Sequence, residues 1–177
     1  MEPGQDRNIA ALTFPFRVCI FLYINLCKKM QHEYMYAYYG EVMEINKIEQ
    51  ELLKLITKAK DKNEVPIAAL IVKNDKIISK SYNKVNKSNN ILDHAEILVI
   101  KKASKKLHNW RLDDCDLYVT LEPCSMSKEV IRKSRIKNTY YFINQNEHLT
   151  EKEPNFIKIE DKINFSNKLT QFFKNKR

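Results

Sequence analysis

Residues 117–127, "LYVTLEPCSMS", join a buried-type strand to the start of a helix. The apolar run that ends at Leu121 is typical of a strand covered on both faces, and helix signals resume near Cys124. A cysteine at this junction lies beside the free N–H groups of a helix N-terminus, whose positive field favours the metal-binding thiolate. The stretch therefore predicts a metal ligand at Cys124, with Ser127 following at the spacing of a further ligand.

The stretch "DHAEIL", residues 93–98, forms a second junction of the same kind and contains His94 and Glu96. One imidazole and one or two thiolates suit tetrahedral zinc, with the last position left for water. On an ideal helix, His94 and Glu96 would point about 200° apart. We therefore expect one metal ligand and one carboxylate that moves protons between a metal-activated water and a leaving group.

The remaining pattern predicts an α/β domain. Apolar residues recur at helical spacing over 44–60, runs at 66–72 and 76–82 form a hairpin, and a polar loop over 83–92 leads to Asp93, a candidate N-cap. Further elements are expected at 94–106, 116–121, 124–134, 138–143 and 156–159, followed by a last helix. This order implies a mixed sheet with helices on both faces. No glycine follows Gly40, so Asn, Asp and Ser must form the turns.

The N-terminal region has a different character. Residues 9–27 are about as long as a membrane span but contain Pro15 and Arg17, and an arginine within a span costs roughly 2.5–3.5 kcal/mol. We therefore do not expect a membrane anchor, and we predict an extension over 1–42, loosely packed or non-native, ahead of a domain over 43–177. Four cysteines are too few for a secreted disulfide framework, which favours a cytoplasmic protein.

The net charge of +9 favours a polyanionic partner, because lysine and arginine release counterions from phosphates. Charge alone does not identify that partner.

The motifs H-x-E and P-C together are typical of zinc nucleobase deaminases. With "EVPIAALIV", "SYN", "NWRL" and "SRI" in the same order, the chain resembles the cytidine deaminase-like superfamily and, within it, the bacterial tRNA-specific adenosine deaminases. The resemblance implies a three-layer α/β/α fold with a mixed central sheet of about five strands. It also implies a homodimer that converts adenosine 34 of the tRNA anticodon arm to inosine.

The resemblance assigns roles to single residues. His94 and Cys124 match ligands of one Zn²⁺ per chain, Glu96 matches the proton shuttle, Ala95 offers a backbone contact beside the base, and Asn83 matches the residue that hydrogen-bonds the flipped purine. The segment "LTQFFKNKR" resembles the family's tRNA-contacting helix, which points to Phe172, Phe173, Lys174 and Arg177. Cys115 is expected to pack in the core.

Ser127 occupies the position of the third zinc ligand, and Lys128-Glu129-Val130 replace the small residues usual in the family. A serine hydroxyl is a poor zinc ligand because it must deprotonate and is harder than a thiolate. Two functions therefore remain open, namely an active zinc deaminase impaired at Ser127 and a catalytically inactive deaminase-fold subunit that binds RNA or a partner. A third possibility is a decayed or mis-started gene product.

Overall fold

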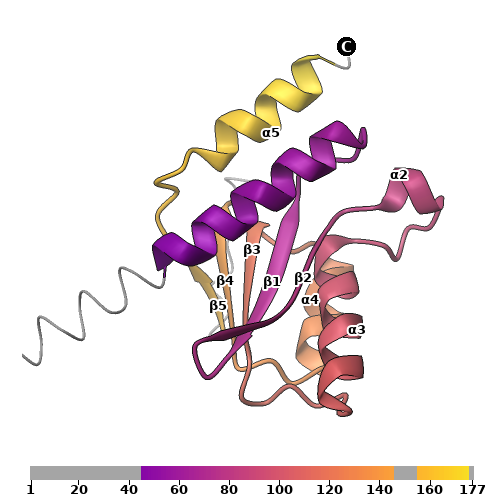
Figure 1. Cartoon of the computed structure of the whole chain (residues 1–177), viewed down its shortest axis with the longest axis vertical. Helices are drawn as coiled ribbons and strands as arrows, with labels where there is room; N and C mark the ends of the chain where they lie inside the picture. The colour runs from indigo at the N-terminus through magenta and orange to yellow at the C-terminus, as the bar shows by residue number, and fades with distance from the viewer. Residues whose placement is uncertain (1–44, 146–154, 176–177) are drawn as a thin grey trace, which may run out of the picture. The chain divides into compact units, whose positions relative to one another are not determined.

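The computed structural model describes residues 45–145 and 155–175, which contain one five-stranded mixed sheet (Figure 1). Its strands are β1 (Ala68–Lys73), β2 (Lys76–Tyr82), β3 (Asp116–Leu121), β4 (Asn138–Ile143) and β5 (Phe156–Lys158). They lie in the order β2-β1-β3-β4-β5, antiparallel from β2 to β3 and parallel from β3 to β5. The predicted mixed sheet is confirmed.

Helices cover the sheet on both faces. Consecutive residues of β1 from Ala68 to Val72 are all buried, and neighbouring residues of a strand point to opposite faces, so neither face is open to water. α3 (Ala95–Leu107) packs on β1 and β2 and against α4 (Ser125–Lys133). Figure 1 shows the first helix, residues 45–61, crossing the sheet beside α5 (Phe165–Lys174). The predicted three-layer arrangement is confirmed.

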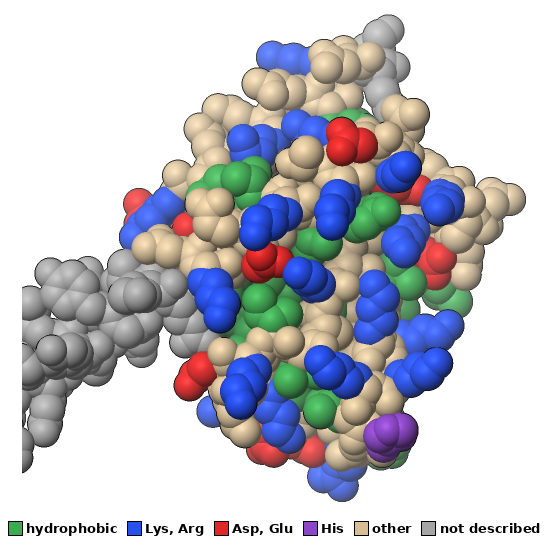
Figure 2. All heavy atoms as spheres, in the orientation of Figure 1, with side chains coloured by type: hydrophobic (Ala, Val, Ile, Leu, Met, Phe, Trp, Pro, Cys, Tyr) green, Lys and Arg blue, Asp and Glu red, His purple; other side chains and the backbone are tan. Residues whose placement is uncertain are grey.

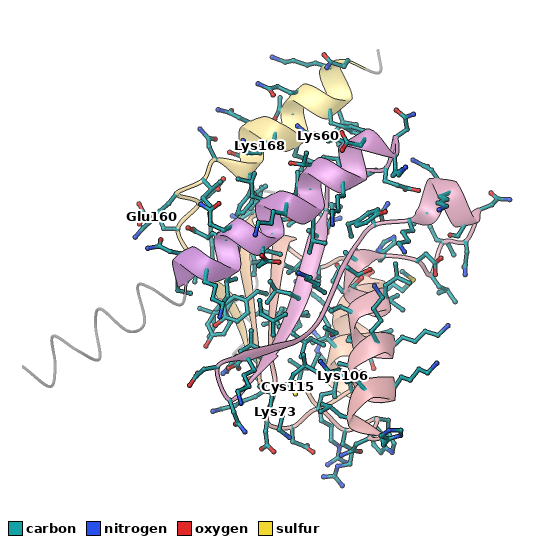
Figure 3. All side chains as sticks on the ribbon, in the orientation of Figure 1. Lys60, Lys73, Lys106, Cys115, Glu160 and Lys168 are labelled. Carbon is teal, nitrogen blue, oxygen red and sulfur yellow. The ribbon has the colours of Figure 1, made fainter. Side chains whose placement is uncertain are left out.

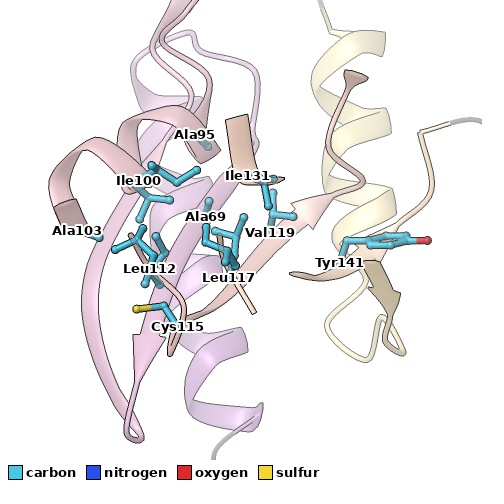
Figure 4. Packing of buried hydrophobic residues seen from close by; sticks show 13 residues of the cluster. Ala69, Ala95, Ile100, Ala103, Leu112, Cys115, Leu117, Val119, Ile131 and Tyr141 are labelled. Atoms are coloured by element: carbon cyan, nitrogen blue, oxygen red, sulfur yellow. The ribbon is translucent and has the colours of Figure 1, made fainter. Parts of the chain in front are cut away.

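The core between the sheet and α3 and α4 explains why these elements form. Ala69 and Ile71 of β1, Leu117 and Val119 of β3 and Val99 of α3 pack in one cluster (Figure 4). Cys115 belongs to the same cluster, as predicted, and burial raises the pKa of its thiol. On the other face, the ring of Phe142 in β4 meets that of Phe165 in α5 at 5.0 Å between centroids, which fixes the last helix to the sheet.

Asparagine and aspartate form many of the turns, as predicted from the absence of glycine after Gly40. Among the described residues, positive φ angles occur mostly at asparagine and aspartate, whose short polar side chains tolerate the left-handed region. They are Asn63, Asn74, Asp75, Asn89 and Asn164. His108 and Arg135 also take this conformation, and these two positions were not expected from their residue types.

Two local predictions were wrong. The expected polar loop over 83–92 contains a short helix, α2 (Val85–Ser88), whose first N–H groups are bound by the carboxylate of Glu64. A distant acidic residue thus supplies the cap that the loop sequence lacks. Asp93 is not the N-cap of α3, because His94 takes that position with φ −63° and ψ 150°.

The predicted extension over 1–42, including its hydrophobic stretch, lies outside the described residues, and the division at residue 43 stays a prediction. Within the two described ranges, no helix has the length and apolar character that crossing a membrane requires.

Candidate active site

His94 and Cys124 occupy equivalent positions in the fold. Each is the N-cap residue of a helix, His94 for α3 and Cys124 for α4, and each has extended backbone angles. Neither side chain makes a capping hydrogen bond to its own helix. Both side chains are therefore available to each other, and they come together in the lining of one pocket.

Ser127 completes a triangle of donor atoms with these two residues. The Cys124 Sγ atom lies 3.7 Å from His94 Nδ1 and 3.6 Å from Ser127 Oγ, and Ser127 Oγ lies 3.4 Å from His94 Nδ1. Ser127 is fully buried in the first turn of α4, one turn after Cys124. The three predicted ligand positions are thus adjacent in space.

The triangle has the dimensions of one face of a tetrahedral zinc site. Zinc bonds of about 2.0–2.1 Å to nitrogen or oxygen and about 2.3 Å to sulfur give edges of roughly 3.4–3.6 Å between ligands. Within the described part of the chain, no group of three or more His, Cys, Asp or Glu side chains is placed to hold a metal. A zinc ion here would therefore have two strong protein ligands, His94 and Cys124, and a serine hydroxyl as the third.

Glu96 lies in the first turn of α3 and lines the same pocket. Its side chain is buried, and burial raises its pKa, opposed by its own backbone N–H, by His94 and by a hydrogen bond with Ser127. Because the helix begins only at Ala95, His94 is not held on the helical spiral. His94 and Glu96 therefore both line one pocket. This is what the predicted roles of a metal ligand and a proton-transferring carboxylate require.

The pocket has a volume of about 190 Å³. This is less than the roughly 300–1,000 Å³ of pockets for drug-sized ligands, so a single planar ring system is a better match than an extended molecule. Its polar lining comes from Asn83, Asn86, His94, Glu96, Glu122, Cys124 and Gln145, and its apolar walls from Val65, Ile67, Val85 and Leu121.

Asn83 and Ala95 lie where the sequence placed them. The Asn83 side chain lines the pocket, its backbone N–H donates to the Ile67 carbonyl at 2.9 Å, and its Nδ2 donates to Glu64 at 3.3 Å. Ala95 is fully buried beside His94, directly at the helix start. Of the predicted site residues, Asn83, His94, Glu96 and Cys124 line the pocket, whereas Ala95 and Ser127 are fully buried next to it in sequence or contact.

Lys128 and Glu122 form a contact that the sequence analysis did not identify. The Lys128 Nζ lies 2.8 Å from Glu122 Oε1, and the backbone N–H of Gln145 donates to Glu122 Oε2 at 3.2 Å. Glu122 precedes Pro123 and Cys124, so these contacts tie the loop that carries Cys124 to α4 and to the end of β4. The larger side chain at residue 128 has a defined partner at the edge of the site.

Three of the predicted RNA-binding residues lie on α5 and do not line this pocket, namely Phe172, Phe173 and Lys174. Phe172 is buried in α5, whereas Phe173 is 49% exposed and Lys174 is exposed. Arg177 falls outside the described residues. Figure 3 shows Lys168 of α5 beside Lys60 of the first helix, and their proximity contributes, after burial, to lowering the pKa of Lys60. Lys168 and Lys174 thus place lysines near both ends of α5.

Glu64, Asn86 and Gln145 are pocket residues, or partners of them, that the motifs did not single out. Glu64 stands in the quoted stretch "EVPIAALIV", but a carboxylate before a strand gives no sign of what it will contact. Gln145 follows β4, and only the parallel pairing of β3 with β4 brings it beside Cys124.

Comparison with known proteins agrees with this geometry. Residues 43–177 match the model of the MafB19-like deaminase family. A Rickettsia bellii (strain RML369-C) protein named tRNA-specific adenosine deaminase is 46% identical over 101 residues, covering 56% of this chain and 70% of the relative. A protein of the same name from Buchnera aphidicola (subsp. Schizaphis graminum) is 37% identical over 137 residues, covering 71% and 91%.

A solved structure from a study of A-to-I editing by tRNA:A34 deaminases has the same fold. It matches with a TM-score of 0.56 at 31% sequence identity, and the match covers 64% of this chain and 98% of that chain.

Proposed function

Because this chain belongs to the MafB19-like deaminase family, we propose that it hydrolyses adenosine 34 of a tRNA anticodon to inosine. The family predicted from the sequence is thereby confirmed. The relatives named tRNA-specific adenosine deaminase support the choice of substrate. The observation that carries the proposal is that His94, Cys124 and the buried Glu96 line one small pocket, with Ser127 in contact with all three.

Zn²⁺, one ion per chain, is the cofactor that the donor set fits. His94 and Cys124 would hold it, with Ser127 or a water at the third position. When bound, zinc supplies a water acidified enough to act as a nucleophile near neutral pH.

The protein's own residues supply the rest of the chemistry. The overall reaction replaces the C6 amino group of adenine by an oxygen from water and releases ammonia. Glu96 takes a proton from the attacking water and delivers it to the departing nitrogen, a role that its burial among His94 and Ser127 supports. Asn83 hydrogen-bonds the base, and the Ala95 backbone lies beside it. Val65, Ile67 and Leu121 give the base apolar walls to pack against.

The tRNA anticodon arm is the proposed partner. Figure 2 shows lysine and arginine side chains spread over the visible face with few acidic groups between them, in keeping with the net charge of +9. Phe173 and Lys174 on α5 offer an exposed ring and a cation for a base and a phosphate. A homodimer in the cytoplasm, as the resemblance implies, is part of the same proposal.

Inosine formation tests this proposal directly. The zinc-loaded full chain is incubated with an anticodon stem-loop that carries adenosine at position 34, and nucleosides are quantified by mass spectrometry. We expect inosine from the wild type and a loss of about 10²-fold or more in Glu96→Gln, which keeps the side-chain size but cannot accept a proton. A stem-loop with guanosine 34 is the substrate control. No inosine from the zinc-loaded wild type would overturn the proposal.

Ser127 supports one alternative, a catalytically inactive subunit that binds RNA. Removing one thiolate from an open zinc site costs metal affinity, and two strong ligands hold zinc weakly. This alternative expects stem-loop binding that weakens with salt but does not change when a chelator removes metal. Deamination by the wild-type chain would exclude it.

A further inference from the structure

Glu64 is a buried carboxylate for which the described residues provide no salt-bridge partner. Its side chain is fully buried between the first helix and β1, and its backbone N–H donates to the Ala59 carbonyl at 2.9 Å. In the described part of the chain, Glu64 takes part in no salt bridge. A buried carboxylate is costly unless hydrogen bonds replace its water, so its donors must hold it in place.

Three N–H groups serve as those donors. The backbone N–H of Lys87 donates to Oε1 at 2.6 Å, while the backbone N–H of Asn86 and the Nδ2 of Asn83 donate to Oε2 at 3.2 and 3.3 Å. Two of these groups belong to the turn of α2, and the third is the side chain that faces the pocket. Asn83, Val85 and Asn86 all line the pocket. One carboxylate therefore holds both a pocket side chain and part of the pocket wall.

The carboxylate also selects the orientation of the Asn83 carboxamide. An asparagine side chain has nearly the same shape after a 180° flip, but the flip exchanges a double donor for an acceptor. An ionised carboxylate only accepts hydrogen bonds, so it binds Nδ2 and repels Oδ1. Glu64 thus keeps Nδ2 on its own side. The second Nδ2 proton and Oδ1 remain for a ligand, in a fixed arrangement.

We propose that Glu64 is a positioning residue that sets the hydrogen-bonding pattern which Asn83 presents to the nucleobase. The expected effect on catalysis rests on the proposed deaminase function. The orientation of the Asn83 side chain does not, because it is a property of the free protein. Glu64 acts through Asn83 and α2 and does not touch the reacting atoms. A base whose donors and acceptors match the fixed carboxamide is bound, and one with the reverse pattern is rejected.

The variant Glu64→Gln tests the positioning without any need for activity. Its amide offers one acceptor oxygen and one donor nitrogen to the same three N–H groups, so the Asn83 carboxamide must flip or lose its partner. In the ¹⁵N-labelled full chain, the Asn83 side-chain amide signal is assigned by its loss in Asn83→Ala. We expect its protons to exchange with solvent at least about tenfold faster in Glu64→Gln than in the wild type. Glu51→Gln, which changes a carboxylate remote from the pocket, is the matched control. Equal exchange in Glu64→Gln and wild type would overturn the inference.

A double-mutant cycle on the stem-loop measures the catalytic consequence. We expect Glu64→Gln to lower kcat/KM about tenfold or more, and the double variant with Asn83→Ala to lose clearly less than the product of the two single losses. Losses that multiply would show that Glu64 acts independently of Asn83 and would contradict the proposal. If Glu64→Gln does not fold, Glu64→Asp, which keeps the charge at shorter reach, takes its place in both experiments. An inactive wild type would overturn the proposed function, and the exchange measurement would still decide the role of Glu64.

Discussion

At the scale of single residues, we infer that Ser127 limits how firmly the proposed site holds zinc. Its Oγ lies 3.4 Å from His94 Nδ1 and 3.6 Å from Cys124 Sγ, so the position of a third ligand is preserved while the atom is changed. Because the geometry is intact, a sulfur placed at residue 127 needs no rearrangement of the backbone to reach the same point. We therefore infer that the proposed zinc site is weakened by the chemistry of the serine hydroxyl and not by its position.

We predict that Ser127→Cys strengthens zinc binding by about 100-fold or more. Zinc affinities of roughly 10–16 kcal/mol shared among four ligands assign ~3 kcal/mol to one thiolate. Competition with a chromophoric chelator measures the dissociation constant. Ser125→Cys, at the exposed first residue of α4 and outside the triangle, is the matched control and should bind as the wild type does. Equal affinities for Ser127→Cys and wild type would show that residue 127 is not a ligand position.

The sequence identified the residues of the site but not their supports. His94, Glu96 and Cys124 lie in short motifs at predicted helix starts. It was therefore predictable that their side chains would lie close together. Glu64 accepts a hydrogen bond from Asn83, which lies 19 residues later in the sequence. Lys128 of α4 forms an ion pair with Glu122, which follows the end of β3. Such contacts depend on tertiary packing, and residue type alone gives no sign of the partner.

At the scale of elements, charged pairs on the surface connect the first helix to the edge strand. Glu51 accepts hydrogen bonds from Lys54 on its own helix and from Lys80 of β2. These two bonds are the main causes that lower the pKa of Glu51 from 4.5 to about 2. The carboxylate is thus favoured in the folded state, and it joins two elements that are not adjacent in the chain.

We predict a pH-dependent stability difference between the wild type and Glu51→Gln. A carboxyl whose folded-state pKa is depressed stabilises the fold above its unfolded pKa, and this contribution is lost as pH falls from about 4.5 towards 2. At pH 7 the variant should be less stable by about 1 kcal/mol or less, because the lysines are largely exposed. Urea unfolding at pH 7 and at pH 3.5 measures the difference, which should shrink in acid. A difference that grows as pH falls would contradict the assignment.

Element order was predictable from periodicity, but the carboxylates that cap two of the helices were not. The strands at 76–82, 116–121 and 138–143 have the predicted bounds, because apolar runs between polar turns mark them clearly. α2 was missed since its cap comes from Glu64, far away in sequence. The start of α5 is similar, because the Asp161 carboxylate accepts the N–H groups of Phe165 and Ser166 from outside the helix.

At the scale of the whole molecule, positive charge and one small pocket fit a nucleic acid that presents a single base. Basic residues number 31 and acidic residues 22. A pocket of about 190 Å³ has room for a base but not for its backbone, which must then lie on the protein surface. Affinity would come from the charged surface, and selectivity from the pocket.

We predict that stem-loop binding weakens steeply with salt and that Lys174 contributes to the slope. Each phosphate contact adds roughly 0.7–0.9 to the slope of log K against log salt concentration. Lys174→Gln should therefore lower the slope by about that amount at unchanged fold, as measured by fluorescence anisotropy between 50 and 200 mM KCl, a range typical of such titrations. Lys133→Gln, an exposed lysine on α4, is the control. A slope that Lys174→Gln leaves unchanged would remove α5 from the proposed interface.

The dependence of deamination rate on free zinc concentration tests the account most directly. Wild-type protein stripped of metal is titrated with buffered zinc, and inosine formed on the adenosine-34 stem-loop is measured at each concentration. We predict a rate that rises from zero and saturates, at a higher free zinc concentration for the wild type than for Ser127→Cys. A wild-type chain that forms no inosine at any zinc concentration, or forms it equally without zinc, would contradict the account.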